Sequence, residues 1–82
     1  MYPTQELCIA AIGSMTAAIK AERALQGAGL SVRIVSLLPE ETKRGCAYGI
    51  EYPCTAEGEV RSALRDAHLT PSQFLKRGGR PL

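Results

Sequence analysis

Cys46 is the residue whose surroundings best suit chemistry at a sulfur atom. It follows Lys43, Arg44 and Gly45 in a charged stretch that begins at Glu40. Two nearby cations favour the thiolate over the thiol, and the thiolate is the form that attacks another sulfur. Gly45 has no side chain to shield that sulfur. The alternative is a small apolar residue that begins a strand, because cysteine is among the most buried residue types.

The other two cysteines have different surroundings. Cys8 lies in the apolar run Leu7–Ile12 and is expected to be buried and inert. Cys54 lies eight residues after Cys46, or roughly 26 Å along an extended chain, so these two cannot bridge. We expect Cys54 to be a spectator or, beside a helix N-terminus, a second reactive thiol. Cys8 could approach Cys46 if their strands were parallel neighbours.

No metal or cofactor site is predicted. The sequence holds no G-x-G-x-x-G, Walker or C-x-x-C motif, and cysteines at 8, 46 and 54 with His68 do not fit zinc spacing. His68, beside Asp66 at the end of a predicted helix, is read as a helix C-terminal cation or a surface group.

Composition limits the possible partners. The net charge of +2 is interspersed along 82 residues, which does not indicate nucleic-acid binding. A cluster of Lys76, Arg77 and Arg80 is expected to be a solvated terminus. No apolar stretch approaches the roughly 20 residues of a membrane span, and the first apolar run is too short for a signal peptide. We expect a cytoplasmic protein with reduced cysteines, whose thin core would favour a homodimer.

The first half of the chain predicts a strand, a helix and a strand. The continuous apolar run at 7–12 is typical of a strand buried on both faces. A helix over 15–28 follows, capped by Ser14 or Thr16 and ended by the glycines at 27 and 29. Its apolar stripe comprises Met15, Ala18, Ile19, Leu25 and Ala28. Residues 30–38 alternate and predict a strand with Val32 and Ile34 on the buried face.

The second half predicts a strand, a helix and a less regular end. Residues 46–52 alternate, with Cys46, Tyr48, Ile50 and Tyr52 on one side. Thr55 is the expected N-cap of a second helix, with acidic residues at 57 and 59 in its first turn. Its apolar stripe comprises Val60, Ala63, Leu64 and Ala67. Residues 72–77 form either a last strand centred on Phe74 or a one-turn helix.

This order predicts an α+β domain, a ferredoxin-like βαββα(β) sandwich in which two helices cover one face of an antiparallel sheet. We expect the first and third strands to be its parallel, central pair. Residues 1–6 would be a disordered lead, 7–77 the single domain and 78–82 a flexible tail.

Several short motifs resemble the selenium/sulfur carrier-like family over about residues 7–77. They are Ala21-Glu22-Arg23-Ala24-Leu25 followed by Gly29, then Val35-Ser36-Leu37-Leu38-Pro39, then Gly45-Cys46-Ala47. Two features depart from the family pattern: Ala47 stands where a glycine usually follows the cysteine, and Lys43-Arg44-Gly45 replaces small hydroxyl residues.

The resemblance implies a carrier that holds sulfur or selenium on Cys46 and passes it on, and not a turnover enzyme. A cysteine desulfurase would be the donor and another protein the acceptor. Lys43 and Arg44 would stabilise the anion. The alternative is a non-catalytic dimerisation or interaction module that uses an exposed Tyr48/Tyr52 side, because the fold alone implies no chemistry. A regulatory ligand-binding domain is a third reading.

Overall fold

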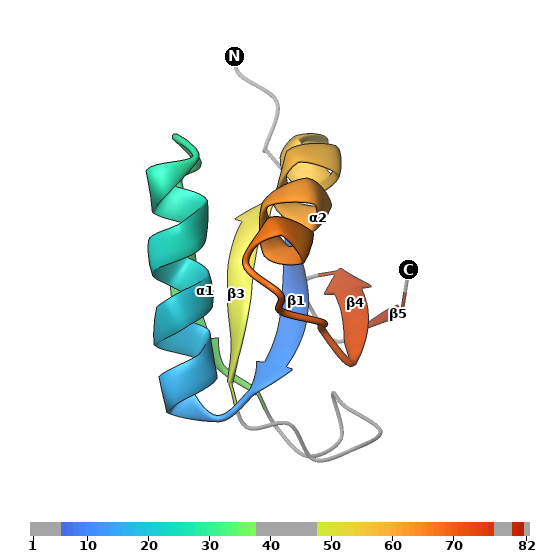
Figure 1. The fold of residues 1–82 in the computed structure, drawn as a ribbon. Helices are drawn as coiled ribbons and strands as arrows, with labels where there is room; N and C mark the ends of the chain where they lie inside the picture. Colours follow the sequence, from blue (N-terminus) through green and yellow to red (C-terminus); the bar gives the residue numbers. More distant parts are fainter. Residues whose placement is uncertain (1–5, 38–47, 77–79, 82) are drawn as a thin grey trace.

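The computed structural model describes residues 6–37, 48–76 and 80–81 of the 82-residue chain (Figure 1). The strands are β1 (Leu7–Gly13), β2 (Arg33–Ser36), β3 (Tyr48–Pro53), β4 (Gln73–Lys76) and β5 (Arg80–Pro81). The helical elements are α1 (Met15–Gly27), the 3₁₀ turn η2 (Cys54–Ala56) and α2 (Glu57–Asp66). Of the two readings of 72–77, the strand is therefore confirmed.

The strands form one sheet in the order β2-β3-β1-β4-β5, and each runs antiparallel to its neighbours. A small α+β domain with an antiparallel sheet and two helices is thus confirmed. The prediction that the first and third strands are parallel is wrong, although they are adjacent. The parallel relation holds between β1 and β2, because β3 lies between them and runs antiparallel to both.

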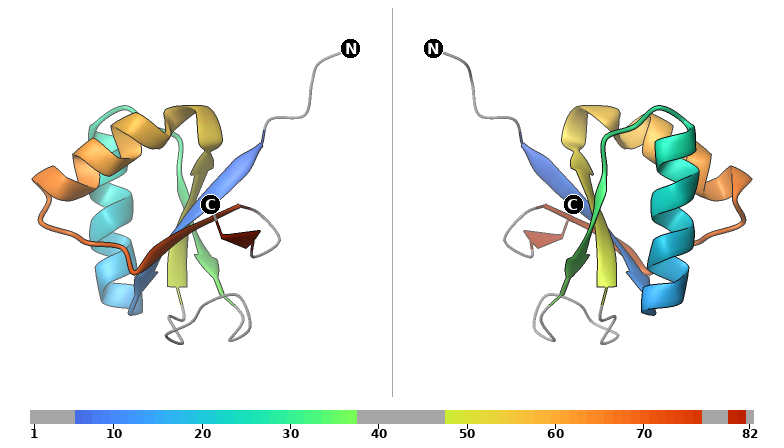
Figure 2. Two further views of the ribbon diagram at one scale, coloured as in Figure 1. Left: turned by 90° about the vertical axis from the view of Figure 1, so that its right-hand side faces the viewer. Right: turned by 90° about the vertical axis from the view of Figure 1, so that its left-hand side faces the viewer.

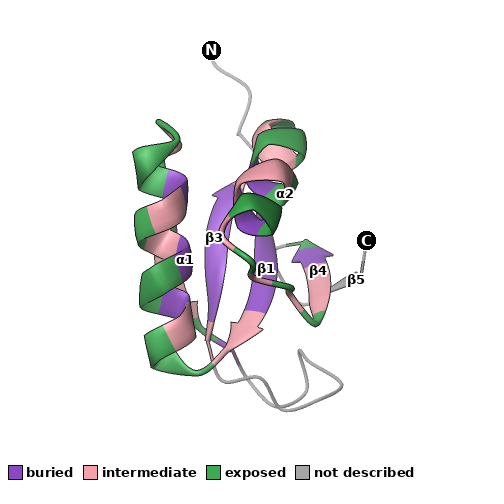
Figure 3. Cartoon of the chain, viewed as in Figure 1, coloured by how far each residue is buried: buried purple, intermediate pink, exposed green. Residues whose placement is uncertain are grey.

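Both helices cover the same face of the sheet (Figure 2), and the larger part of the core lies between the two layers. The buried residues of this layer are Cys8, Ala10, Ala18, Ala21, Leu25, Ile50, Tyr52, Val60 and Leu64. Figure 3 shows the purple, buried stripes of the helices turned toward β3 and β1. Burial of this apolar surface is the main term that holds helices on a sheet.

Two predicted surfaces differ in the structure. Met15 and Ile19, expected in the buried stripe of α1, are 42% and 38% exposed. Ala28 of the same predicted stripe is also exposed, whereas Ala18 and Leu25 are buried as predicted and Ala21 is buried with them. The small alanine side chains let the helix backbone approach the sheet closely. Tyr52 is 1% exposed and Tyr48 is half-buried against the same core. The exposed tyrosine side required by the interaction-module alternative is therefore absent.

The opposite face of the sheet carries a second, smaller apolar cluster. Ile9, Ala11, Leu37 and Leu75 are buried there, and Val35 packs against them. The first strand is thus buried on both faces, as predicted. The second strand is shorter than expected, and it contributes to both faces through Ile34 and Val35.

The ends of α1 follow the sequence signals. The Ser14 hydroxyl accepts the Ala17 N–H at 3.2 Å, which decides between the two predicted caps. Gly29 has φ of +85°, the left-handed conformation in which glycine ends a helix without steric cost.

The start of α2 differs from the prediction. The N-cap is Ala56, which makes no side-chain cap, so the expected role of Thr55 is wrong. Residues 54–56 form η2 instead, and the Glu57 N–H donates to the Cys54 carbonyl. Glu57 and Glu59 do lie in the first turn, where their negative charges interact favourably with the positive end of the helix dipole.

The predicted tail includes one described pairing. Arg80 and Pro81 form β5, in which Arg80 pairs with Lys76 and Pro81 with Leu75. Of the three basic residues expected in a solvated terminus, Lys76 lies in β4 and Arg80 in β5, while Arg77 lies outside the described residues.

Candidate functional site

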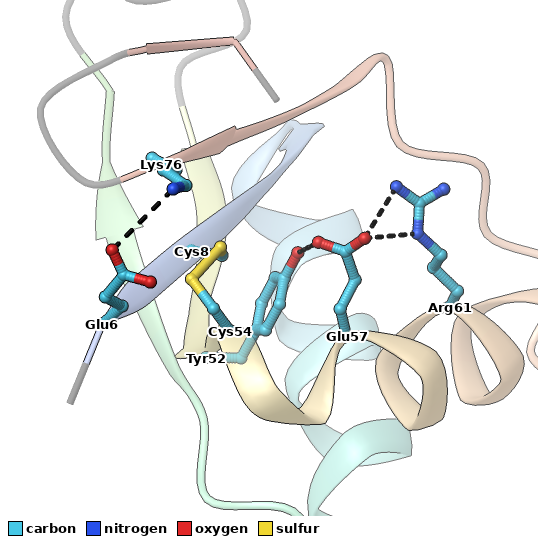
Figure 4. The surroundings of a disulfide bond; sticks show 7 residues. All are labelled: Glu6, Cys8, Tyr52, Cys54, Glu57, Arg61 and Lys76. Carbon is cyan, nitrogen blue, oxygen red and sulfur yellow. Dashed lines mark hydrogen bonds and ion pairs between the residues drawn. A yellow bond between two sulfur atoms is a disulfide. The ribbon is translucent and has the colours of Figure 1, made fainter.

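The start of β1 and the end of β3 lie side by side, and this brings two cysteines together. Cys8 is the register partner of Tyr52, and the pairing continues where the Cys54 N–H donates to the Glu6 carbonyl at 3.0 Å. The Cα atoms of Cys8 and Cys54 are 5.1 Å apart, and their sulfur atoms form a disulfide (Figure 4).

This disulfide corrects four expectations. The prediction that all the cysteines are reduced thiols is wrong for Cys8 and Cys54, which are bonded to each other. Cys8 is buried as predicted, but it is bonded and not an inert thiol. Cys54 is its partner and not a spectator. The approach of Cys8 to Cys46 required parallel strands, and that premise is wrong. The sequence positions do carry a signal for this disulfide: Cys8 lies near the start of its strand and Cys54 just after the end of another. Two antiparallel neighbouring strands bring such positions together.

The two halves of the disulfide differ in accessibility. Cys8 is 1% exposed and lies in the core beneath the helices. Cys54 lies in η2 and is only partly buried. A thiolate or reductant from solution therefore reaches this bond from the Cys54 side.

A polar row runs beside the disulfide (Figure 4). The Tyr52 hydroxyl donates to Oε1 of Glu57 at 3.4 Å. Arg61 binds Oε2 of the same carboxylate through Nε and Nη2, each at 3.1 Å. The Arg61 guanidinium also lies 3.9 Å from the centroid of the Phe74 ring. The row ties β3, α2 and β4 together.

Burial and the neighbouring carboxylate keep the Tyr52 phenol protonated. Burial is the larger cause that raises the pKa of Tyr52 well above its ordinary value, and the charge and hydrogen bond of Glu57 raise it further. Arg61 opposes this shift. Tyr52 is therefore a hydrogen-bond donor and not a base at neutral pH.

This shift predicts a specific loss of stability in alkali. The folded chain holds the Tyr52 proton more tightly than the unfolded chain, so the contribution is complete below the unfolded pKa of about 10 and declines above it. The stability difference between wild type and Tyr52→Phe should stay constant up to about pH 9. It should then fall by up to about 1.4 kcal/mol per pH unit. Urea denaturation of both proteins across this range measures it, and parallel curves above pH 10 would contradict it.

A second charged pair lies across β2 and β3, which the sequence did not indicate. Arg33 and Glu51 are register partners, and the Nε of Arg33 lies 2.7 Å from Oε1 of Glu51. The Glu51 side chain is 4% exposed and that of Arg33 is 65% exposed. The exposed guanidinium thus compensates a buried carboxylate, which is costly to bury without a partner.

The predicted reactive residues lie outside the described residues. Lys43, Arg44, Gly45 and Cys46 belong to the segment 38–47 that joins β2 to β3. The structure describes both points of attachment: Ser36 pairs with Tyr48, and Tyr48 also pairs with Gly13. The segment is thus anchored where β1 leads into α1, at the opposite end of β3 from the disulfide.

His68 follows Ala67, the C-cap of α2, and so lies at the helix C-terminus as predicted. Its backbone has φ of +60°, and its N–H donates to the Arg65 carbonyl at 3.0 Å.

Other site types can be assessed for the described part of the chain. In the ranges 6–37, 48–76 and 80–81, no three His, Cys, Asp or Glu side chains converge as metal ligands. Neither helix described here has the length and apolar character needed to cross a membrane.

Comparison with known proteins gives one match. The family model described as "Putative Se/S carrier protein-like" matches residues 7–76, which is most of the chain and includes position 46. No curated protein and no solved structure matches the chain.

Proposed function

We propose, on the premise that this chain belongs to the Se/S carrier protein-like family, that it accepts a single sulfur or selenium atom on Cys46. It holds the atom as a persulfide or selenosulfide and passes it to a partner. The protein acts as a carrier and not as a turnover enzyme. Its donor is a persulfide-bearing protein such as a cysteine desulfurase.

The observation that carries this proposal is the pairing of the other two cysteines. The chain has three cysteines, and the disulfide uses Cys8 and Cys54. Cys46 therefore has no cysteine left to bond within the same oxidised chain. A carrier needs such a thiol, because a neighbouring thiol would attack the persulfide and release the cargo.

The length of β3 supports the same conclusion. Tyr48 and Cys54 lie at opposite ends of this strand, roughly 20 Å apart at the usual rise per residue. Two residues of chain from Tyr48 to Cys46 span at most about 7 Å. The Cα atoms of Cys46 and Cys54 thus stay more than about 7 Å apart, beyond the reach of a disulfide.

The transfer step balances without a further reagent. The Cys46 thiolate attacks the terminal sulfur of the donor's persulfide, one S–S bond forms, and the donor's cysteine leaves as a thiolate. An acceptor nucleophile repeats the step on the Cys46 persulfide. Lys43 and Arg44 stabilise the thiolate and then the persulfide anion, and Gly45 leaves room for the donor.

The fold supports this proposal as a compact scaffold. Insertion of β3 between β1 and β2, with α1 crossing over, is the split βαβ order on which a ferredoxin-like sandwich is built. We include that arrangement in the proposal. The segment 38–47 is attached to β3 at Tyr48, and β3 is paired with β1 on one side and with β2 on the other.

Mass spectrometry of the intact protein tests the proposal. Wild type incubated with a cysteine desulfurase and cysteine should gain the mass of one sulfur atom. Cys46→Ser should lose this gain, with labelling reduced at least about tenfold if a persulfide requires a thiolate.

The matched control removes the other two cysteines. Cys8→Ala/Cys54→Ala retains Cys46 as its only thiol, so it should still gain one sulfur atom. Equal labelling of Cys46→Ser, or no labelling of either wild type or the control, contradicts the assignment.

A further inference from the structure

The two helices end in the same backbone motif with different residues at its left-handed position. Residues 28–30 read Ala-Gly-Leu and residues 67–69 read Ala-His-Leu. In each, the leucine N–H donates to the carbonyl of a leucine five residues earlier, at 3.0 and 2.9 Å. Gly29 has φ of +85° and His68 has φ of +60°.

His68 therefore occupies a left-handed backbone position that favours glycine. Among the described residues, it is the one non-glycine residue with a positive φ. Histidine tolerates this conformation better than most residues, but a Cβ atom there still costs stability that glycine would not lose. Such a cost, when it is retained, points to a role for the side chain.

The imidazole lines a groove with two other nitrogen donors. Arg61 and Arg65 lie at i and i+4 on one side of α2, and His68, just beyond the end of this helix, lines the same groove. The groove has a volume of about 490 Å³, within the range of small-molecule sites. The remaining wall is formed by Leu64, Leu69, Thr70, Pro71 and Phe74. The groove thus joins cationic and apolar surfaces and has no acidic lining residue.

One of these cations is held in place before any ligand arrives. Arg61 binds the Glu57 carboxylate at 3.1 Å, and its guanidinium lies 3.9 Å from the centroid of the Phe74 ring. These contacts reduce the entropy that this side chain would lose on binding. The stacked guanidinium and ring also border the groove with flat surfaces, which suit a flat ligand group.

We propose that this groove binds a phosphate monoester with a flat apolar body. Arg61 and Arg65 supply positive charge and donors for a phosphate dianion, whose oxygens match guanidinium forks, and His68 supplies a further nitrogen donor. Phe74, Leu69 and Pro71 contact the apolar body. The groove is lined by residues 61–74 and shares none of the residues assigned to the sulfur chemistry at Cys46.

Amide chemical shifts of the isotope-labelled full chain, titrated with phenyl phosphate, test the proposal. Saturable shifts should centre on residues 61–74, with a dissociation constant below about 1 mM, the affinity of a modest small-ligand site. Inorganic phosphate should bind at least about tenfold more weakly, because it lacks the apolar body. Phenol should give no saturable shift in these residues.

His68→Gly separates function from structure. The variant should melt at a temperature higher by about 2–6 °C, because strain is relieved. Its dissociation constant for phenyl phosphate should rise at least about fivefold, as for loss of a hydrogen bond to a charged group. Arg65→Gln should weaken binding to a similar degree.

Matched controls define the outcomes. Gly29→Ala, at the same position of the other helix end, should lower the melting temperature and leave the titration unchanged. Cys46→Ser should bind phenyl phosphate as wild type does, so the two proposals fail separately. Unchanged affinity in His68→Gly, or shifts centred outside residues 61–74, would overturn the proposal.

Discussion

Loss of the Cys8–Cys54 disulfide is expected to lower the free energy of unfolding by roughly 4 kcal/mol. The bond joins residues 46 positions apart, so it closes a loop of more than half of the chain. In the chain-entropy account, a loop of this length gives about 4 kcal/mol at 25 °C. A domain of this size has a total stability of about 5–10 kcal/mol, so the loss would leave it marginal.

Two routes to the same state test this prediction. Urea denaturation of wild type should shift to lower midpoints when a thiol reductant is added, and Cys8→Ala/Cys54→Ala should show a comparable shift without reductant. The double variant also loses a small amount of packing at Cys8, which lies in the core. Reduced wild type separates the two effects, because it keeps the sulfur atoms.

Cys46→Ser is the matched control for this experiment. It removes a cysteine outside the disulfide, so it should unfold at the wild-type midpoint and still respond to reductant. A shift below about 1 kcal/mol on reduction, or an equal loss in Cys46→Ser, would contradict the expected contribution of the bond.

Local patterns in the sequence predict the elements of this fold well. The apolar run from Leu7 predicts β1, and the glycine-ended stripe predicts a helix within one residue of α1. Alternation places Ile50 and Tyr52 on one side of β3, and the structure shows both in the core between the sheet and the helices. Each of these signals acts between residues close in sequence, where backbone geometry and burial fix the outcome.

Relations between distant residues are harder to predict. The prediction that β1 and β3 are neighbours is confirmed, but their relative direction depends on the connections: β1 and β2 run parallel across α1, and β3 runs antiparallel to both. The wrong strand direction also misplaces Cys8: parallel strands would put it near Cys46, whereas the antiparallel register puts it beside Cys54. Thr55 was a good cap by type, but the chain forms η2 there before α2 begins.

The candidate site divides in the same way. Composition and spacing single out Cys46 and its basic neighbours, which lie outside the described residues. The structure adds the pairing of the other two cysteines, on which the assignment to Cys46 depends. His68 shows the limit of sequence reasoning most directly. It reads as an ordinary helix-end histidine until its positive φ and its place in a groove are known.

Gly49→Ala is expected to destabilise the domain by about 1–3 kcal/mol, the usual cost of overpacking a tight interior site. A Cβ atom at this position would lie 2.8 Å from the Ala10 carbonyl oxygen and 2.8 Å from Cγ2 of Ile9. It would also lie 3.1 Å from Cδ1 of Leu37. The Ile9 and Leu37 side chains can shift, but the Ala10 carbonyl belongs to a strand that is paired on both sides. The strand cannot move away without losing ladder hydrogen bonds.

The same substitution elsewhere provides the control. Gly58 lies in the first turn of α2, and a Cβ atom there would meet nothing within 4 Å. Gly58→Ala should therefore stabilise the domain by about 0.5–1 kcal/mol through helix propensity. Opposite signs for the two variants in urea denaturation would show that close packing of β3 against β1 sets the cost at Gly49. A neutral or stabilising Gly49→Ala would mean that the central strands can separate by several tenths of an ångström. The anchor of the 38–47 segment on β3 would then be looser than this register implies.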